Sequence, residues 1–340
     1  MKIIVTGGAG FIGRHLVRYL HDQALANGSS ECQLLNLDKL TYASDETSLS
    51  ELTSSPRYTF EQVDLCDADT VRRLVSEFAP DAIFHLAAES HVDRSIEGPG
   101  EFIQTNVIGT FNLLQAARSH FDSLDKVRSE SFRFIHVSTD EVYGSLDFEQ
   151  SGFTESSRYD PRSPYSASKA ASDHLVRAWH HTYGLPVIVT NCSNNYGPEQ
   201  YPEKLIPTVI TRALAGEPIP VYGDGRNVRD WLYVGDHVTA LAAVLQRGNV
   251  GETYNVGGNC ERSNIDLVRK ICEVLNQAAP SAKSYAEQIS FVTDRPGHDL
   301  RYAMDTTKIE NKLGWRPEME FDAGLRKTIL WYVGEAGSRQ

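Results

Sequence analysis

Apolar and polar positions follow two different spacings along the first half of the chain. Short apolar runs, rich in β-branched residues, predict strands over Lys2–Thr6, Gln33–Leu37, Thr59–Val63, Ala82–Leu86, Phe132–Ser138 and Pro186–Thr190. Apolar residues three and four positions apart predict helices over Phe11–Leu20, Asp69–Phe78, Asn106–Ala117 and Tyr165–Tyr183. Alternating strands and helices are typical of a doubly wound parallel sheet. The pattern therefore predicts an α/β fold with a Rossmann-type domain over residues 1–190.

The pattern changes after Asn191. Loops rich in Asn, Gly and Pro separate shorter segments, and these segments predict helices over Pro207–Ala215, Val234–Leu245 and Asn264–Asn276. We interpret residues 191–340 mainly as a smaller substrate-binding lobe, with some segments returning to the first domain. We expect Tyr285–Glu287 and the last few residues to be mobile.

Composition and charge narrow the range of functions. Hydrophobic residues make up 41% and charged residues 23% of the chain, as in an ordinary soluble protein. The net charge of −12 argues against nonspecific binding to nucleic acid, which needs a basic face. The five cysteines form no C-x-x-C pair, which favours a reducing compartment. No signal peptide is visible, and no apolar run approaches the roughly 18 residues of a membrane span. We therefore expect a cytoplasmic protein with no membrane or nucleic-acid partner.

Three glycines lie between the first predicted strand and the first predicted helix. Gly7, Gly10 and Gly13 form G-x-x-G-x-x-G, which allows a tight turn, close approach of a pyrophosphate and close packing of helix on strand. Phosphates would then bind at the N-terminus of the helix. On the glycines alone, a loop that serves only packing remains an alternative. Asp38 ends the second strand, where an acid binds the adenosine ribose and disfavours the 2′-phosphate of NADP, so the sequence predicts NAD. Asp64 ends the third strand, where it would contact the adenine.

Tyr165 and Lys169 form a Y-x-x-x-K motif at the start of a predicted helix. Positions i and i+4 share one face of a helix, so we expect the ammonium to lower the pKa of the phenol, together with the positive nicotinamide ring. A tyrosine and a lysine four apart also occur by chance on many helices. Here the pair follows a strand that ends at Ser138-Thr139. This combination resembles the extended short-chain dehydrogenase/reductase superfamily. The resemblance implies that Thr139 binds the sugar hydroxyl that is oxidised and that Lys169 holds the nicotinamide ribose.

Two acids, Asp140 and Glu141, follow Thr139 directly. An epimerase of this superfamily needs only the tyrosine and a hydride carrier, whereas a 4,6-dehydratase also needs an acid and a base. Oxidation at C4 makes the C5 proton acidic, so a base can remove it while an acid protonates the departing C6 hydroxyl. Adjacent carboxyls in different environments can divide these tasks. A polar cap at the strand end is the structural alternative.

The resemblance to the family of dTDP-glucose 4,6-dehydratases covers essentially the whole chain. The stretches that carry it are TGGAGFIG, LAAESHVDRSI, STDEVYG, SPYSASKA, TNCSNNYGP, PEKLIP, VYGDG, RDWLYV, NVGG, NID and DRPGHDLRY. STDEVYG and DRPGHD are specific to the nucleotide-sugar dehydratases. The sequence departs from the family pattern at Glu199, and residues 27–31 and 119–131 form longer loops than the minimal pattern. Surface loops tolerate such insertions.

The resemblance also implies a role for each matching residue. Tyr165 would be the base at the C4 hydroxyl, Asp140 the acid at C6 and Glu141 the base at C5. The residues implied for NAD are Gly7, Gly10, Phe11, Ile12, Gly13, Asp38, Lys39, Asp64, Leu65, Ala87, Thr105, Tyr165, Lys169 and Asn195. Those implied for the nucleotide-diphosphate sugar are Ser90, Thr139, Asn194, Lys204, Leu205, Tyr222, Arg229, Asn264, Arg295 and His298. The family also implies a homodimer that forms through helices 100–117 and 165–183.

The residues themselves support the substrate site more weakly. Lys204, Arg229 and Arg295 are cations in loops of an acidic protein, suited to a diphosphate, although each alone could be a surface ion-pair partner. We expect no metal, because His180-His181 reads as an exposed helix end and NAD with the carboxyls leaves a metal no task.

Other functions remain open at this point. Within the superfamily these are a nucleotide-sugar 4-epimerase, a UDP-glucuronate decarboxylase and a GDP-mannose dehydratase; the Asp140-Glu141 pair argues against each. An NAD-binding regulator without activity is the alternative from another class, and the presence of Tyr165, Lys169 and both acids argues against it. The residues do not identify the nucleotide base, and thymine is implied by the resemblance only.

Overall fold

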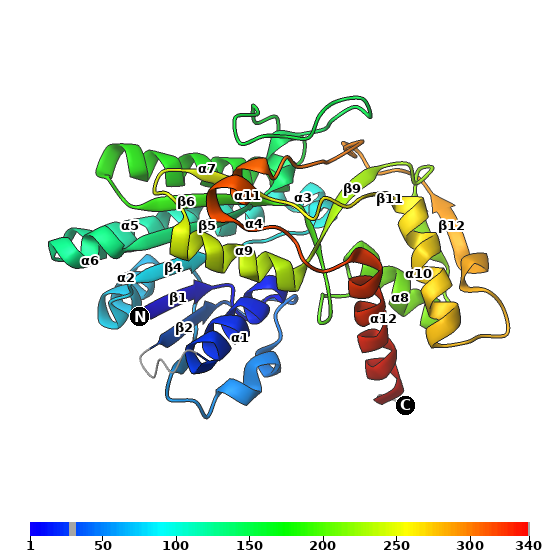
Figure 1. Cartoon of the computed structure of the whole chain (residues 1–340), viewed down its shortest axis with the longest axis horizontal. Helices are drawn as coiled ribbons and strands as arrows, with labels where there is room; N and C mark the ends of the chain where they lie inside the picture. Colours follow the sequence, from blue (N-terminus) through cyan, green and yellow to red (C-terminus); the bar gives the residue numbers. More distant parts are fainter. Residues whose placement is uncertain (27–31, 339–340) are drawn as a thin grey trace.

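A seven-stranded parallel sheet forms the centre of the larger domain in the computed structural model, which describes residues 1–26 and 32–338 (Figure 1). The strands are β1 Lys2–Thr6, β2 Gln33–Asp38, β3 Tyr58–Gln62, β4 Ala82–His85, β5 Arg133–Thr139, β6 Val187–Cys192 and β10 Thr253–Val256. Their order is β10-β6-β5-β4-β1-β2-β3, and each neighbouring pair is parallel. Successive strands extend the sheet outward on both sides of β1. The predicted doubly wound α/β fold is therefore confirmed.

Helices cover both faces of this sheet. One face carries α1 Phe11–Ala26, α9 Val234–Arg247 and α11 Thr307–Leu313, and the other carries α2 Ala68–Phe78, α5 Thr110–Asp122 and α7 Pro164–Tyr183. The helices bury apolar residues such as Leu16 and Val17 against Ile3 and Val5 of β1. Burial of this kind, repeated on both faces, is the main stabilising contribution to an α/β domain.

The region between β4 and β5 differs from the predicted single helix Asn106–Ala117. After α3 Val92–Glu97, the chain forms α4 Pro99–Phe102, a π-helical segment η2 Ile103–Gly109 and then α5. Residues 119–131 are not a longer loop, because α5 continues to Asp122 and α6 spans Lys126–Ser131. The Asp125 side chain caps α6 by accepting a hydrogen bond from the Arg128 amide, a local signal for a helix start. The predicted loop 27–31 lies outside the described residues.

The smaller lobe has its own apolar core. It contains α8 Leu205–Ala215, α10 Asn264–Ala278 and α12 Phe321–Ser338, with a sheet of β7 Asn194–Tyr196, β9 Val228–Tyr233 and β11 Glu261–Ser263 and a pair of β8 Ile219–Tyr222 with β12 Ile289–Val292. The segment Tyr285–Glu287, which we expected to be mobile, forms part of the 3₁₀ helix η4 Tyr285–Gln288. Tyr285 is buried there, and its hydroxyl donates to the Ala279 carbonyl at 2.7 Å.

Three described segments that follow β6 belong to the larger domain. Strand β10 pairs with β6 at the edge of the main sheet, and α9 and α11 pack on the α1 face.

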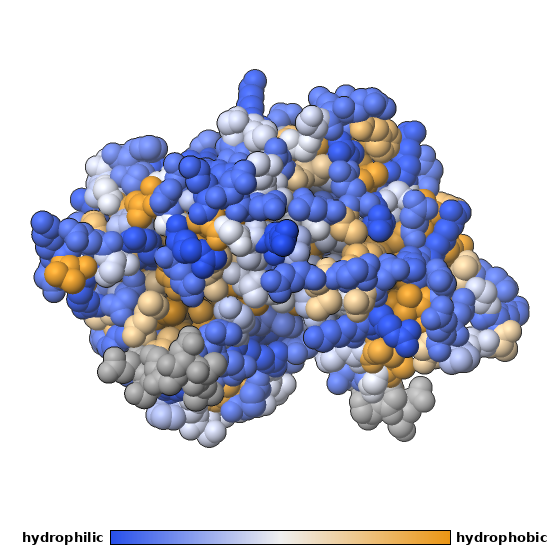
Figure 2. All heavy atoms as spheres, in the orientation of Figure 1, coloured by the Kyte–Doolittle hydropathy of each residue, from blue (hydrophilic) through white to orange (hydrophobic). Residues whose placement is uncertain are grey.

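Figure 2 shows that hydrophilic residues predominate on the visible surface. Within residues 1–26 and 32–338, no helix combines the length and the apolar character needed to cross a bilayer.

Candidate active site

A cavity of about 290 Å³ lies at the carboxyl ends of the parallel strands, where open α/β sheets bind their ligands. It extends from the glycine turn after β1 to the Asp140-Glu141 pair after β5 and on to Lys204 before α8. The predicted site residues that line it are Gly7, Gly10, Phe11, Ile12, Gly13, Asp38, Lys39, Ala87, Ser90, Thr105, Thr139, Asp140, Glu141, Tyr165, Lys169, Asn194, Asn195 and Lys204. The fold thus brings the dinucleotide motif and the expected catalytic residues into one cavity.

A Cβ at Gly7 or Gly13 would meet backbone atoms, so neither position of the glycine turn accepts a larger residue. Gly7 has a φ of 73°, and a Cβ there would lie 2.7 Å from the amide nitrogen of Ala87, two residues after β4. A Cβ on Gly13 would lie 2.0 Å from the Gly7 carbonyl oxygen, so α1 could not pack as closely on the turn. The sequence assigned these two glycines to the turn and to packing. The geometry agrees with both assignments.

Asp38 ends β2 and connects the glycine turn with the loop that follows the strand. Its carboxylate accepts hydrogen bonds from the amides of Ala9 at 2.9 Å and Leu40 at 2.8 Å, and from the Ser44 hydroxyl at 3.0 Å. A carboxylate can accept about four hydrogen bonds, so these contacts leave capacity for a ligand hydroxyl. Asp38 is therefore both a structural acceptor and a wall of the cavity.

Two residues predicted for the cofactor lie beside the cavity without lining it. The Asp64 carboxylate lies 2.9 Å from the Lys39 ammonium, and this ion pair raises the pKa of Lys39. Leu65 is buried in the core, and its carbonyl accepts a hydrogen bond from the Asn112 amide group at 2.9 Å. Asp64 therefore does not line the cavity itself, but it forms an ion pair with Lys39, which does.

Tyr165 and Lys169 lie one turn apart near the start of α7, where Ser163 and Ser166 form a capping box. That Lys169 and the nicotinamide ring together lower the pKa of Tyr165 stays a prediction for the enzyme with NAD bound. Burial raises the pKa of Tyr165 well above its usual range, and the nearby Glu141 adds to this shift. The Lys169 ammonium instead donates to the Val137 carbonyl of β5 at 2.9 Å. Spacing along a helix placed both groups on one face, but it could not show what surrounds them.

The Asp140-Glu141 pair directly follows β5. Burial raises the pKa of Asp140 well above its usual range, and the charges of Glu141 and Asp230 add to the shift. Burial also raises the pKa of Glu141, but the positive charges of three residues oppose that shift: Arg295, Lys204 and Arg229. The Thr139 hydroxyl donates to Asp140 at 3.2 Å. Asp140 is thus the carboxyl that holds a proton more strongly, and Glu141 is the one that cations favour as a carboxylate.

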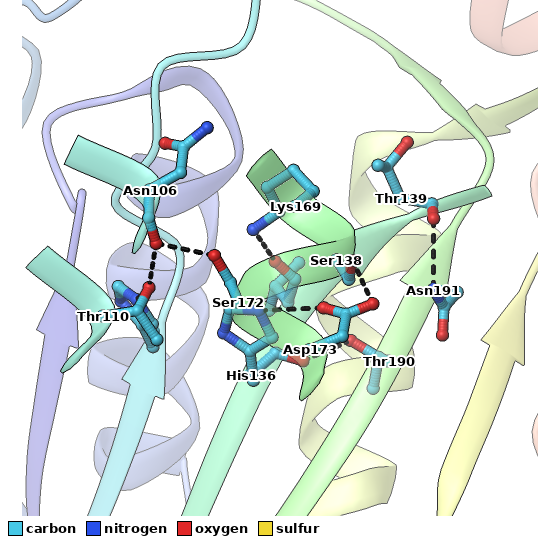
Figure 3. Close-up of polar contacts among 12 residues, drawn as sticks. Asn106, Thr110, His136, Ser138, Thr139, Lys169, Ser172, Asp173, Thr190 and Asn191 are labelled. Atoms are coloured by element: carbon cyan, nitrogen blue, oxygen red, sulfur yellow. Dashed lines mark hydrogen bonds and ion pairs between the residues drawn. The ribbon is translucent and has the colours of Figure 1, made fainter. Parts of the chain in front are cut away.

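A buried polar network supports the end of β5 from behind (Figure 3). Asp173 of α7 is fully buried, and it accepts hydrogen bonds from the hydroxyls of Ser138 at 2.9 Å and Tyr159 at 2.8 Å. The His136 imidazole of β5 lies 3.1 Å from the same carboxylate. Figure 3 shows Asp173 on α7 beside Ser138 and His136 on β5, the strand that ends at Thr139. A buried carboxylate with several donors holds its neighbours in place, because each donor would otherwise lose its partner.

The π-helical segment η2 contributes a further polar wall. Its Asn106 carbonyl accepts hydrogen bonds from the hydroxyls of Thr110 at 2.5 Å and Ser172 at 2.6 Å (Figure 3). Thr105 lines the cavity, and its buried hydroxyl has no protein partner. Such wide turns frequently occur at functional sites. The Thr105 hydroxyl is therefore available to a ligand.

The remaining predicted substrate residues lie outside the lining of the cavity. They are Leu205, Tyr222, Arg229, Asn264, Arg295 and His298. Tyr222 packs beside Arg295 and His298, with 5.7 Å from the guanidinium carbon to the Tyr222 ring centre and 6.3 Å between the Tyr222 and His298 rings. Burial and the charges of Arg295 and Arg229 lower the pKa of His298 to about 4. The Asn264 amide oxygen and one ring nitrogen of His298 are buried and have no hydrogen-bond partner.

The cavity also has walls that the sequence did not predict. They are Thr41, Ala43, Ser44, Leu86, Ala88, Glu89, Val137, Ser138, Cys192, Ser193, Gln200, Tyr201 and Glu203. Most follow the carboxyl end of a strand, so their position after β2, β4 or β6 was a signal in the sequence that could have placed them at the cavity.

Among the described residues, no group of three or more His, Cys, Asp or Glu is arranged to hold a metal ion.

The chain matches known proteins over almost its whole length. A family model described as GDP-mannose 4,6 dehydratase matches residues 4–328. A dTDP-glucose 4,6-dehydratase of Haemophilus influenzae is 52% identical over 99% of both chains, and one of Xanthomonas campestris pv. campestris is 57% identical over 97% of this chain and 92% of its own. The crystal structure of DesIV, a dTDP-glucose 4,6-dehydratase from Streptomyces venezuelae, matches with a TM-score of 0.89 and 45% identity, over 99% of this chain and 98% of that one. The chain therefore belongs to the dTDP-glucose 4,6-dehydratase family of enzymes.

Proposed function

We propose that this enzyme converts dTDP-glucose to dTDP-4-keto-6-deoxyglucose and water with bound NAD. The observation that carries the proposal is that Asp140 and Glu141 share one cavity with the glycine turn, Tyr165 and Lys169. An epimerase would have no use for two carboxyls at this place. The S. venezuelae relative was crystallised with NAD and TYD bound, which supports the same ligands here.

The residues present fit a dinucleotide. The first amides of α1, from Phe11 to Gly13, have no acceptor within the helix, which suits a pyrophosphate. Asp38 would bind the adenosine ribose, and the free Thr105 hydroxyl and Lys169 would hold the nicotinamide half. NAD, when bound, supplies the hydride acceptor at C4 and the hydride donor at C6, and its oxidised ring adds a positive charge that lowers the pKa of Tyr165.

The protein side chains would divide the proton transfers. Tyr165 removes the proton of the C4 hydroxyl, which the Thr139 hydroxyl orients. Glu141 then removes the C5 proton, since three cations favour its carboxylate form. Asp140, whose pKa burial raises, would give its proton to the C6 hydroxyl so that it leaves as water. The residue that takes the C5 proton returns a proton to C5 when C6 is reduced.

The substrate residues would bind the diphosphate and the base on the far side of the sugar. Lys204 lines the cavity, and Arg229 and Arg295 add positive charge nearby, which suits a diphosphate. Ser90, Asn194, Leu205, Tyr222, Asn264 and His298 complete the proposed set. The unpartnered Asn264 amide oxygen supports a polar ligand on that side.

We also propose a homodimer through α4, η2, α5 and α7. Large apolar side chains are exposed on these helices at Ile103, Ile108, Phe111 and Tyr183. Exposed apolar groups on neighbouring helices favour association with another surface of the same kind. Sedimentation equilibrium of the purified protein, compared with a Phe111→Glu variant, tests this proposal.

The five cysteines are free thiols, which supports our proposal that the enzyme works in the cytoplasm. Titration of thiols in freshly isolated protein should find all five reactive after unfolding without a reductant. Disulfide-linked cysteines in that preparation would contradict the proposal.

The reaction is tested with labelled substrates. We expect dTDP-glucose, and neither UDP-glucose nor GDP-mannose, to give a 4-keto-6-deoxy sugar. dTDP-glucose deuterated at C4 should give a product with deuterium at C6, without net consumption of NAD. In deuterated water, unlabelled substrate should gain deuterium at C5 only. Solvent deuterium at C6 would rule out the dehydratase reaction.

A further inference from the structure

Glu199 lies in a loop that forms one wall of the cavity. Residues 197–204 contribute Gln200, Tyr201, Glu203 and Lys204 to its lining. Glu199 itself has a φ of 66°, a backbone conformation that side chains with a Cβ rarely adopt. Such a conformation persists where the surrounding contacts favour it. The Glu199 carboxylate makes such contacts with two arginines of α1.

The carboxylate is bound by α1, the helix that follows the glycine turn. One Arg18 nitrogen donates to both Glu199 oxygens, at 2.8 and 2.9 Å. Arg18 and Glu199 are 181 positions apart in sequence. The side chains of Glu199 and Arg18 are 21% and 28% exposed, so water screens the pair only in part. This ion pair therefore joins the loop 197–204 to the Rossmann domain.

A second arginine of α1 contacts both the loop and the glycine turn. The Arg14 guanidinium donates to the Ala9 carbonyl at 2.7 Å and to the Gly10 carbonyl at 3.2 Å, and it lies 3.6 Å from Glu199. Its side chain is only 6% exposed. The other acid near it, Asp45, is 3.9 Å away and 51% exposed, so Glu199 is the better-placed counter-charge. A buried guanidinium without an adjacent acid is costly, so Arg14 depends on Glu199.

We propose that Glu199 is a positioning residue that holds the loop 197–204 against the glycine turn. These two segments form two walls of the cavity, and the contact between them helps each wall to keep its ligand bound. The inference rests on the proposed function, which assigns NAD to the glycine turn and the nucleotide sugar to the other wall. Arg14 is the link, because the same guanidinium contacts Glu199 and two carbonyls of the turn. Loss of the Glu199 charge loosens both walls and leaves the reacting groups of β5 and α7 in place.

The test compares Glu199→Gln with the matched control Glu51→Gln. Glu51 also pairs with Arg18, at 2.7 Å, but it lies in the 3₁₀ segment η1 Glu46–Leu52 of the same domain. Labelled NAD is released from the holoenzyme into excess unlabelled NAD, and steady-state turnover of dTDP-glucose is measured in parallel. For Glu199→Gln we expect NAD release and KM each to rise about five- to tenfold, the size expected for a partly exposed charge-assisted hydrogen bond. kcat at saturating NAD and substrate should change by less than about twofold, and Glu51→Gln should match the wild type.

A second variant keeps the test decisive if Glu199→Gln folds poorly. Arg18→Gln removes the same contact from the α1 side. The double variant Glu199→Gln/Arg18→Gln should bind NAD and substrate no more weakly than the weaker-binding single variant does. Equal behaviour of Glu199→Gln and Glu51→Gln overturns the proposal, as does a fall in kcat with unchanged KM and NAD release. Failure of both Glu199→Gln and Arg18→Gln to fold also overturns it, since the contact would then serve only the fold. If the wild type neither holds NAD nor converts dTDP-glucose, the proposed function fails instead.

Discussion

Mild acid should weaken the fold through His136, which lies in β5 behind the active site. Its side chain is fully buried, and burial lowers the pKa of its imidazole from 6.5 to about 4, with the Lys169 charge acting in the same direction. The unfolded chain therefore takes up a proton at a higher pH than the folded chain does. This contribution to stability is present above pH 6.5 and is lost progressively as the pH falls toward 4.

The size of the effect follows from the shift in pKa. A shift from 6.5 to about 4 makes full protonation of His136 unfavourable by about 3 kcal/mol in the folded state relative to the unfolded state. Between pH 7 and pH 5 the unfolded imidazole becomes almost fully protonated and the folded one remains neutral. The loss over this interval is therefore about 2 kcal/mol from His136 alone.

The assay is urea unfolding of the wild type and of His136→Gln at pH 7, 6 and 5, followed by circular dichroism. Glutamine can still donate to Asp173 but does not titrate. We expect the wild type to lose about 2 kcal/mol more than the variant between pH 7 and pH 5. An exposed-histidine control, His181→Gln, should follow the wild type. Parallel pH dependences of the wild type and His136→Gln would refute the reasoning.

Three further predictions concern the site. Glu141→Gln should let a 4-keto-glucose nucleotide accumulate, with turnover about 10²–10⁴-fold lower, whereas Tyr165→Phe should form no ketone; mass spectrometry of quenched reactions distinguishes them, and no ketone in either variant would contradict the assignment of Glu141. Asp38→Asn should reduce the preference for NAD over NADP, measured as the ratio of dissociation constants, and tighter wild-type binding of NADP would count against the role of Asp38. Gly13→Ala should lower the free energy of unfolding by about 1–3 kcal/mol, because its Cβ would meet a carbonyl oxygen at 2.0 Å; Gly334→Ala, whose added Cβ would meet no atom within 4 Å, is the control.

The sequence by itself determined those features that depend on neighbours along the chain. Alternating apolar runs and helical periodicities established the doubly wound sheet. The spacing of Gly7 and Gly13 determined the tight turn, and the i, i+4 spacing placed Tyr165 and Lys169 on one face of α7. The position of Asp38 at the end of a strand placed it at the carboxyl edge of the sheet, since parallel strands all end there.

The tertiary structure decided what depends on segments far apart in sequence. Strand β10 joins the main sheet beside β6, and the sequence did not identify that strand. The pKa of Tyr165 rises because the fold removes water from it and brings Glu141 close. In the sequence, Glu199 is visible only as a departure from the family pattern. The fold brings Arg18 and Arg14 into contact with it. Periodicity shows which face of an element is apolar, but not which distant segment covers it, and a pKa depends on the solvent and charges that the fold assembles around the group.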